Sequence, residues 1–234
     1  MIAVNLVRAT QFDEGSKWRG TLVPAAGEMS AYFGRQSRAP MGHQSLEPDS
    51  EKNLRDSFRR AQKRIRQTAV SSRLNCLLTL TFAEEPLRID VVAALTANTF
   101  RRALYRIPRF PYIWTVEKGS EGGRLHVHAL ISESSVENVK RAWDLGLAQV
   151  RSFPLDSESL RTAASYLSKD LESMLVHNGQ SYRIAKGFKP ESLRLPSGLD
   201  RSTLIRFASD EMGASPFSIY ESSRYPAITA LWEV

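Results

Sequence analysis

"YIWTVEKGSEGGRLHVHALI", residues 112–131, is the stretch that determines the fold we expect for this chain. Two runs rich in β-branched and aromatic residues flank the segment KGSEGG, a pattern typical of a β-hairpin. Because side chains alternate between the two faces of a strand, His126 and His128 share one face, and the apolar residues around them share the other. A turn centred on residues 120–122 brings the carboxylate of Glu117, on the preceding strand, near His126.

Two imidazoles and one carboxylate are ligands that suit Mg²⁺, Mn²⁺ or Zn²⁺, with coordination positions left for substrate oxygens. The alternative is an exposed strand that carries two solvated histidines and a glutamate. Two histidines on one face beside a glutamate favour the metal site. Cupins also use His-x-His, here followed by Glu133, but their framing glycines are missing because no glycine lies between Gly123 and Gly146.

The remaining segments mix strands and helices without a regular βαβ alternation. "LNCLLTLTF", residues 74–82, is apolar and β-branched and predicts a buried strand. Apolar residues at helical spacing predict helices over 51–70, 90–105, 134–146 and 158–176. The stretches MIAVNLVRA and WRGTLVP at the start are strand-like, residues 34–50 read as linker, and beyond about residue 180 we assign only short strands and loops. This mixture predicts an α+β fold around an antiparallel sheet.

The composition is that of a soluble globular protein with a basic surplus. Lys+Arg 32 against Asp+Glu 25 gives a net charge of +7, which suits a polyanionic partner such as nucleic acid. The single Cys76 excludes an internal disulfide and a cysteine-based zinc cluster, and it suits a reducing compartment. The sequence has no apolar run of 18 residues and no signal-peptide pattern, so we expect a cytoplasmic protein without a membrane partner.

The predicted helix over residues 51–70 has one apolar stripe and one basic face. The stripe consists of Leu54, Phe58, Ala61, Ile65 and Ala69. The basic face includes Arg59, Lys63 and Arg66, and within the helix only Glu51 and Asp56 offset its cations. Such a face is either simply solvated or contacts phosphates. We predict that these three cations bind DNA.

Tyr166 lies off the apolar stripe of the predicted helix over residues 158–176, by about a third of a turn. Lys169 follows at i+3, on the side away from the stripe. A helical tyrosine by itself is typical of a partly buried packing residue. Near a metal that polarises a phosphodiester, and with a cation close by, a tyrosine hydroxyl becomes a nucleophile for phosphoryl transfer.

The order of three motifs resembles the HUH superfamily of rolling-circle replication initiators, of the plasmid and filamentous-phage type. The motifs are LTLTF (78–82), the hairpin 112–131 and YLSK (166–169), and the resemblance covers about residues 51–176. It implies a ferredoxin-like or RNA-recognition-like core, a central antiparallel sheet of about five strands with helices on one face and the metal on the other.

The resemblance also implies a division of the chain and a role for each motif residue. Residues 1–50 form an N-terminal extension of short strands and linker that packs on the core, 51–180 the nicking domain, and 181–234 a C-terminal extension of unknown role. His126, His128 and Glu117 correspond to the ligands of Mn²⁺ or Mg²⁺. Tyr166 corresponds to the nucleophile that joins the 5′-phosphate of single-stranded DNA and frees a 3′-OH, and Lys169 to the lysine that positions the phosphate.

Two departures affect what the resemblance implies. The motif carries one tyrosine, and Tyr182 is a possible second nucleophile that no motif supports. The sequence has no G-x-x-x-x-G-K-[ST] phosphate loop, so we expect recruitment of a host helicase. The expected substrate is single-stranded DNA at an origin, presented as a hairpin.

Three rival functions share some of these features. Single-tyrosine transposases and plasmid-mobilisation relaxases both use His-x-His and tyrosine, although relaxases place the tyrosine before the histidines. A non-catalytic single-strand-binding module on an RNA-recognition-like sheet would instead stack bases on aromatic residues such as Phe82, Trp114 and Tyr112. This last alternative leaves the histidines, Glu117 and Tyr166 unexplained.

Overall fold

The computed structural model describes residues 16–35, 50–84, 88–105, 109–119, 124–169, 182–222 and 227–234. The expected strand in MIAVNLVRA and most of the expected linker lie outside these residues. The chain divides into two compact units. The terminal unit comprises Met1–Leu22, Glu28–Gln44 and Ser192–Trp232, and the central unit comprises Val23–Gly27, Ser45–Glu191 and Glu233–Val234. Among the described residues, no helix combines the length and apolarity needed to cross a bilayer.

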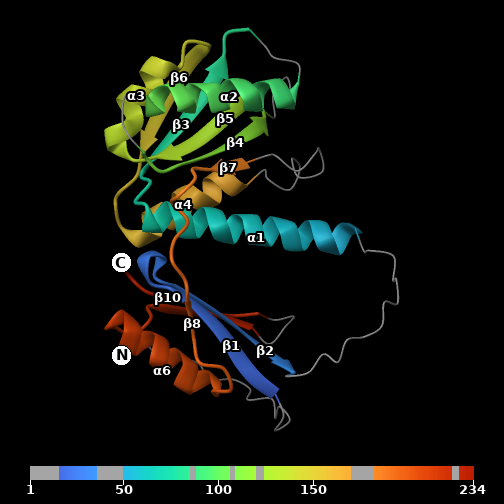
Figure 1. The fold of residues 1–234 in the computed structure, drawn as a ribbon, viewed down its shortest axis with the longest axis vertical. Coiled ribbons are helices and arrows are strands. Elements are labelled where there is room, and N and C mark those ends of the chain that lie inside the picture. The colour runs from blue at the N-terminus through green and yellow to red at the C-terminus, as the bar shows by residue number, and fades with distance from the viewer. Residues whose placement is uncertain are drawn as a thin grey trace. The chain divides into compact units, whose positions relative to one another are not determined.

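The central unit contains a five-stranded sheet in which every pairing is antiparallel (Figure 1). Its order is β6-β3-β5-β4-β7. The strands are β3 (Cys76–Phe82), β4 (Tyr112–Lys118), β5 (Leu125–Ile131), β6 (Gly146–Ser152) and β7 (Tyr182–Ile184). With helices α2 (Ile89–Leu104) and α3 (Val136–Ala142) between strands, β3-α2-β4-β5-α3-β6 is the ferredoxin-like β-α-β-β-α-β arrangement. The predicted α+β fold with a five-stranded antiparallel sheet is confirmed.

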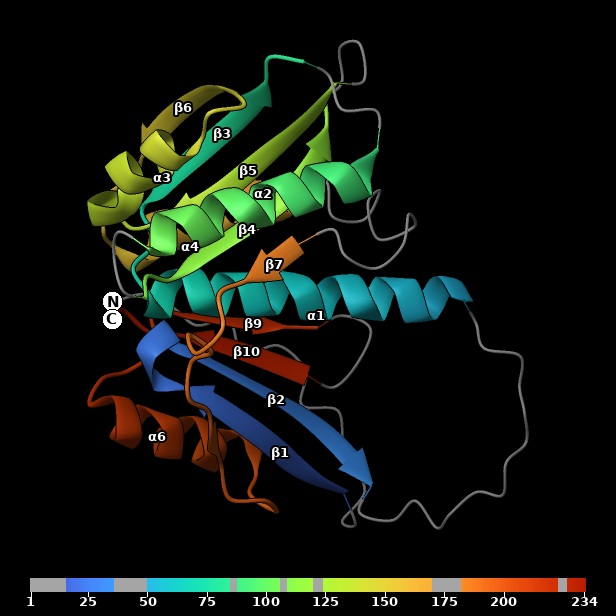
Figure 2. The same cartoon turned by 45° about the horizontal axis from the view of Figure 1, so that its top comes forward.

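Helices cover both faces of this sheet, so the expectation of helices on one face only is wrong (Figure 2). Helices α2 and α3 cover the face that carries Leu78, Val127 and their neighbours. Helices α1 (Ser50–Ser71) and α4 (Ser157–Ser168) cover the opposite face, where Leu77 and Leu130 are buried beneath them. The reason is that the histidine-bearing face is apolar along half of its length, and apolar strand residues need a covering layer.

Helix α1 follows the predicted amphipathic pattern along its described side chains. Ala61, Ile65 and Ala69 are buried, and Phe58 packs against the same core at its edge. The helix ends where Arg73 adopts a left-handed conformation with φ of 52°, and Leu74 then donates its N–H to the carbonyl of Ala69. This reversal leads the chain directly into β3.

Two elements of the structure are absent from the sequence prediction. Strand β6 lies at the edge of the sheet with most of its residues exposed, so it lacks an apolar period. Helix α6 (Arg201–Met212) corrects the assignment of only short strands and loops beyond residue 180. Its ends carry recognisable signals, because Asp200 accepts the N–H of Thr203 and Gly213 adopts a left-handed φ of 66°.

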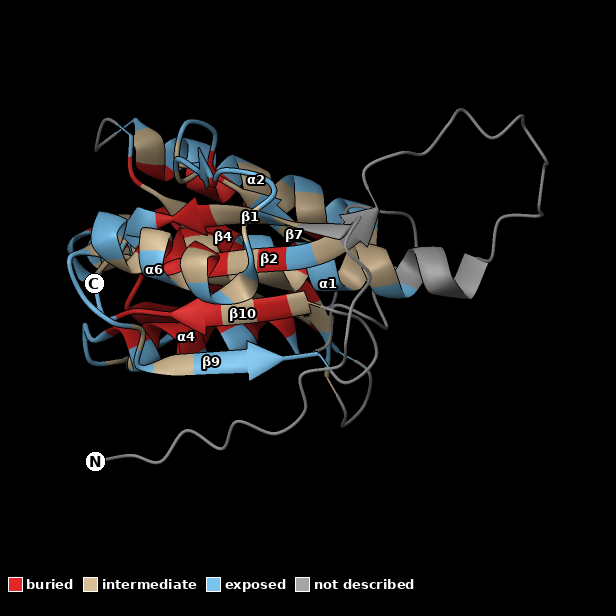
Figure 3. Cartoon of the chain, turned by 90° about the horizontal axis from the view of Figure 1, so that it is seen from below, coloured by how far each residue is buried: buried red, intermediate tan, exposed pale blue. Residues whose placement is uncertain are grey.

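The terminal unit combines segments from both ends of the chain in one sheet of order β8-β1-β2-β10-β9. Its strands are β1 (Ser16–Val23), β2 (Glu28–Arg35), β8 (Leu193–Arg194), β9 (Ser218–Glu221) and β10 (Ala227–Leu231), and the 3₁₀ turns of the chain are Pro24–Ala26 and Glu133–Ser135. Helix α6 packs on one face through Leu204 and Ala208. Figure 3 shows β10 largely buried and the edge strand β9 largely exposed. The strands of the two expected extensions therefore pair with one another.

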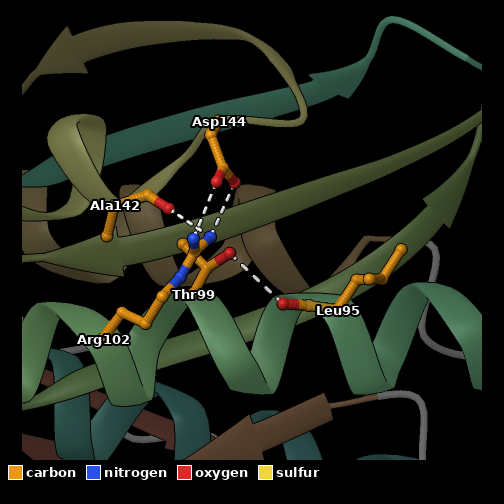
Figure 4. A network of polar contacts seen from close by, with 5 residues as sticks. All are labelled: Leu95, Thr99, Arg102, Ala142 and Asp144. Atoms are coloured by element: carbon orange, nitrogen blue, oxygen red, sulfur yellow. Dashed lines mark hydrogen bonds and ion pairs between the residues drawn. The ribbon is translucent and has the colours of Figure 1, made fainter.

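A polar network joins α2 to the connection between α3 and β6 (Figure 4). The guanidinium of Arg102 donates two hydrogen bonds of 2.7 Å to the carboxylate of Asp144 and one of 2.6 Å to the carbonyl of Ala142. One turn earlier, the hydroxyl of Thr99 donates to the carbonyl of Leu95. This bidentate pair fixes the position at which the chain enters β6.

We expect Asp144→Asn to lower the melting temperature slightly at about pH 6 and by less at about pH 3. The Arg102 guanidinium lowers the pKa of the Asp144 carboxyl from its ordinary 3.8 to about 2. Because the folded pKa lies below the unfolded one, the stabilisation is present above about pH 4 and is lost as the pH falls toward 2. The effect is small because both side chains are largely exposed. A melting-temperature difference that stays constant over this pH range would contradict the assignment.

Candidate active site

The strand registers place five polar side chains on the histidine-bearing face of the sheet. His126 pairs with Thr81 of β3 and with Glu117 of β4, and His128 pairs with Thr79 and with Thr115. Residues directly opposite one another in neighbouring strands point to the same face. The predicted proximity of Glu117 to His126 in the hairpin is therefore present as a direct pairing of the two residues.

The carboxylate of Glu117 makes its closest contact with the other histidine. Its Oε2 lies 2.6 Å from Nε2 of His128, and both side chains are mostly buried. A short contact of this kind is a hydrogen bond in which the imidazole N–H donates to the carboxylate. It fixes the orientation of the His128 ring from the β4 side.

Threonine hydroxyls hold the other nitrogen of each imidazole. Thr79 Oγ1 lies 3.2 Å from Nδ1 of His128, and Thr81 Oγ1 lies 3.3 Å from Nδ1 of His126. A hydroxyl both donates and accepts, so it satisfies Nδ1 in either neutral tautomer. Both rings are thus oriented with Nε2 as the nitrogen available to a ligand. Sequence reasoning missed these two residues, although their alternation within LTLTF was a usable signal.

Gly119 leaves space beside the ring of His126. A Cβ atom at residue 119 would lie 3.1 Å from Nε2 of His126 and 3.3 Å from the carbonyl oxygen of Arg124. Gly119 has no left-handed φ, so the backbone itself does not require glycine there. The close approach of the imidazole is what a larger residue would disturb.

These donors fit a divalent ion in their chemistry, but they are not yet closed around one. Two Nε2 atoms and a carboxylate suit a divalent ion, and the Nδ1 partners and the space at Gly119 leave these atoms accessible. Yet the described residues contain no gathered group of three or more His, Cys, Asp and Glu side chains that could hold a metal. Because Glu117 bonds directly to Nε2 of His128, an ion would have to replace that hydrogen bond.

Helix α4 brings Tyr166 to the same site. Asp156 caps the helix by accepting the N–H of Ser159, and the helix buries Leu160 and Leu167 while Tyr166 is 50% exposed. The ring centroid of Tyr166 lies 6.2 Å from that of His128, with the planes nearly perpendicular at 88°. The tyrosine predicted from its position off the apolar stripe therefore lies beside one of the two histidines.

Lys169 lies directly after the last residue of α4. Its N–H donates to the carbonyl of Tyr166 over 3.3 Å, and its side chain is exposed. The cations predicted to bind DNA lie on α1, the helix that packs against α4. Arg59 is exposed, whereas Lys63 and Arg66 are partly buried and have interaction partners. The basic residues therefore flank the tyrosine helix without touching the histidine pair in any contact described above.

The aromatic residues required by the single-strand-binding alternative are mostly in the core. Trp114 and Phe82 are buried under α2 and α3, and the ring of Tyr112 packs 4.5 Å from that of Phe100. Burial also raises the pKa of the Tyr112 hydroxyl. Residues in this environment cannot stack on bases, so this alternative loses its binding surface. Tyr182, by contrast, pairs with Thr115 and shares the histidine face, two strands from β5.

Comparison with protein families bears on the region that contains these residues. Residues 75–174 match a family model described as "Replication-associated protein", of the ORF2 type. The match spans less than half of the chain, begins one residue before β3 and includes His126, His128, Glu117, Tyr166 and Lys169. Comparisons with curated proteins and with solved structures give no match. The family match supports, in general terms, a replication initiator of the rolling-circle kind.

Proposed function

We propose that the protein initiates rolling-circle replication by nicking single-stranded origin DNA, with Tyr166 as the nucleophile. The observation that carries this proposal is the position of Tyr166 beside His128, whose ring is held by both Glu117 and Thr79. All four residues lie within the segment that matches the replication-associated family.

The chemistry is an exchange of one phosphodiester for another. The phenolic oxygen of Tyr166 loses its proton and attacks the phosphorus, the bond from phosphorus to the 3′ oxygen breaks, and that oxygen takes up a proton. The products are a 5′-phosphotyrosine and a free 3′-OH that primes synthesis. Lys169 supplies positive charge one helical turn from the nucleophile, where the phosphate lies. Because the bond energy is conserved, a later 3′-OH can reverse the step without ATP.

His126, His128 and Glu117 are the residues that would hold a divalent ion, Mn²⁺ or Mg²⁺. Such an ion would draw negative charge from the scissile phosphate and so favour attack by a weak nucleophile. The histidine rings contribute by keeping Nε2 directed away from the Nδ1 contacts with the threonines. Glu117 contributes by exchanging its bond to His128 for a bond to the ion.

We expect Thr79→Val to weaken Mn²⁺ binding by about 10- to 100-fold, the usual cost of removing a partner that orients a metal-binding histidine. Valine has the shape of threonine but no hydroxyl, so Nδ1 of His128 loses its contact. Isothermal titration with Mn²⁺ alone measures the change without any cleavage assay. Thr79→Ser keeps a hydroxyl and should bind nearly as the unmodified protein does. Equal affinity of the valine and serine variants would contradict the orienting role.

The partners follow from the proposed chemistry. The nick site is single-stranded, as in a hairpin extruded at the origin, and the basic residues of α1 contact its phosphates. A host helicase extends the unwinding, because the sequence has no phosphate loop of its own. The protein then acts in the cytoplasm of the host cell.

Covalent capture tests the proposal directly. The protein is incubated with Mn²⁺ and a labelled pool of single-stranded oligonucleotides that includes random-stem hairpins. A protein–DNA band that resists SDS and disappears with chelator supports the mechanism, and sequencing of the captured DNA gives the nick site. Tight DNA binding without any adduct, with Mn²⁺ and with Mg²⁺, would contradict it.

A further inference from the structure

The terminal unit carries two exposed tyrosines on one face of its sheet. Tyr32 of β2 is 55% exposed and Tyr220 of β9 is 58% exposed. Tyr32 pairs with Ala227 of β10, and Tyr220 pairs with Thr229 two residues further along the same strand. Both tyrosines therefore point to the same face, because alternate residues of β10 share a face.

This face is the one that α6 does not cover. The core under α6 contains Ala31, Ile228 and Ala230, which are the residues that alternate with the tyrosine-face positions. Arg201 of α6 also forms an ion pair with Glu221, the neighbour of Tyr220 on the opposite face. The tyrosine face and the helix-covered face are thus separated by the sheet itself.

Arginines and hydroxyls surround the tyrosines on the open face. Arg19 and Thr21 of β1 alternate with Leu22, which lies in the core, and Arg194 of β8 pairs with Thr21. Both arginines are exposed. Among the described residues of the tyrosine face, the one carboxylate is that of Glu28, which is buried. The exposed part of the face is consequently cationic and aromatic.

Sheet geometry gives the spacing of the two rings. Two strand spacings of about 4.8 Å and a stagger of two residues, about 6.8 Å, separate their Cα atoms by about 12 Å. Two aromatic rings on an open sheet, flanked by arginines, are the arrangement on which unpaired bases stack while cations follow the phosphates. A rigid sheet presents the rings at little further cost in conformational entropy.

We propose that this face of the terminal unit is a second binding site, for single-stranded nucleic acid, with bases stacked on Tyr32 and Tyr220 and phosphates held by Arg19 and Arg194. The site is separate from the residues of the proposed nicking reaction and does not depend on that reaction. It gives the chain a means to retain an unpaired strand whether or not Tyr166 has reacted.

Binding and crosslinking in the full chain test this proposal. All proteins carry Tyr166→Phe, so that no strand is cleaved, and the probe is oligo(dT) containing 5-iodouracil, longer than the roughly 4–16 nucleotides of a typical platform. We expect photocrosslinks at Tyr32 and Tyr220. We expect the double variant Tyr32→Ala with Tyr220→Ala to raise Kd by roughly 30-fold or more, from about 1 kcal/mol or more per stacked base.

Two matched variants separate stacking from other effects. Tyr105→Ala removes a tyrosine of the central unit that is 83% exposed, and it should leave Kd unchanged. The double variant Arg19→Ala with Arg194→Ala should reduce the slope of log Kd against log salt by about 1.4, or 0.7 per phosphate contact.

The possible outcomes distinguish this inference from the proposed function. Crosslinks confined to the central unit, or equal Kd values for the Tyr32/Tyr220 and Tyr105 variants, would overturn the second site even if covalent capture by Tyr166 succeeds. A change in oligomeric state without a change in Kd would show that the face docks a second copy instead, and would also overturn it. Crosslinks at both tyrosines support the site even if no adduct ever forms at Tyr166.

Discussion

Tyr166→Phe should reduce covalent capture of single-stranded DNA to background, by about 10³-fold or more, and leave the Kd for DNA nearly unchanged. The variant removes only the oxygen that attacks the phosphorus, and the loss of a nucleophile is among the largest effects known for single substitutions in enzymes. The ring, which makes the edge-on contact with His128, remains in place. The adduct is measured on denaturing gels and binding by fluorescence anisotropy with the same oligonucleotide.

Tyr182→Phe is the matched control for this experiment. Tyr182 shares the histidine face through its pairing with Thr115, yet it lies two strands away from β5 and packs partly against the core. Adduct formation should survive its substitution. Capture that persists in Tyr166→Phe and disappears only when Tyr182 is also replaced would assign the nucleophile to Tyr182. Capture that persists in both would contradict tyrosine attack altogether.

The hairpin and the basic helix were predictable because their patterns are local. Strand parity in RLHVHALI and the glycines of KGSEGG were sufficient to place His126 and His128 on one face with Glu117 beside them. Tyr166 was identified by helical spacing, since a residue displaced from the buried stripe points toward the edge of the helix. These features depend on short-range periodicity, which a single sequence displays directly.

The contacts between elements distant in sequence could not be read in this way. Thr79 reaches His128 only because β3 pairs with β5, and no local pattern fixes the register of strands 49 residues apart. The pairing of β2 with β10 joins the two ends of the chain for the same reason. Strand β6 escaped prediction because an exposed edge strand does not alternate in hydrophobicity. Helix α6 had signals at both caps but only a weak apolar stripe.

Replacing both His126 and His128 by Ala should lower metal-dependent capture by more than about 100-fold. Removal of one orienting partner of a metal-binding histidine costs about 10- to 100-fold, so removal of the ligands themselves should exceed that loss. The same variant should lose measurable Mn²⁺ binding by isothermal titration. Its DNA affinity in the presence of chelator should change little, because the cations of α1 and Lys169 are retained.

A purely structural role of the histidines predicts a different result. In that case the double variant would lose stability, since Glu117 and the two threonines would lose their hydrogen-bond partners, and capture would fall in proportion to the unfolded fraction. Gly119→Ala separates these possibilities without removing any polar group, because its methyl would crowd Nε2 of His126 at 3.1 Å. Weaker Mn²⁺ binding at an unchanged melting temperature would place the ion at that nitrogen. Unchanged Mn²⁺ binding, or capture by the double histidine variant that persists in chelator, would remove the metal from the mechanism and leave Tyr166 to act with cations alone.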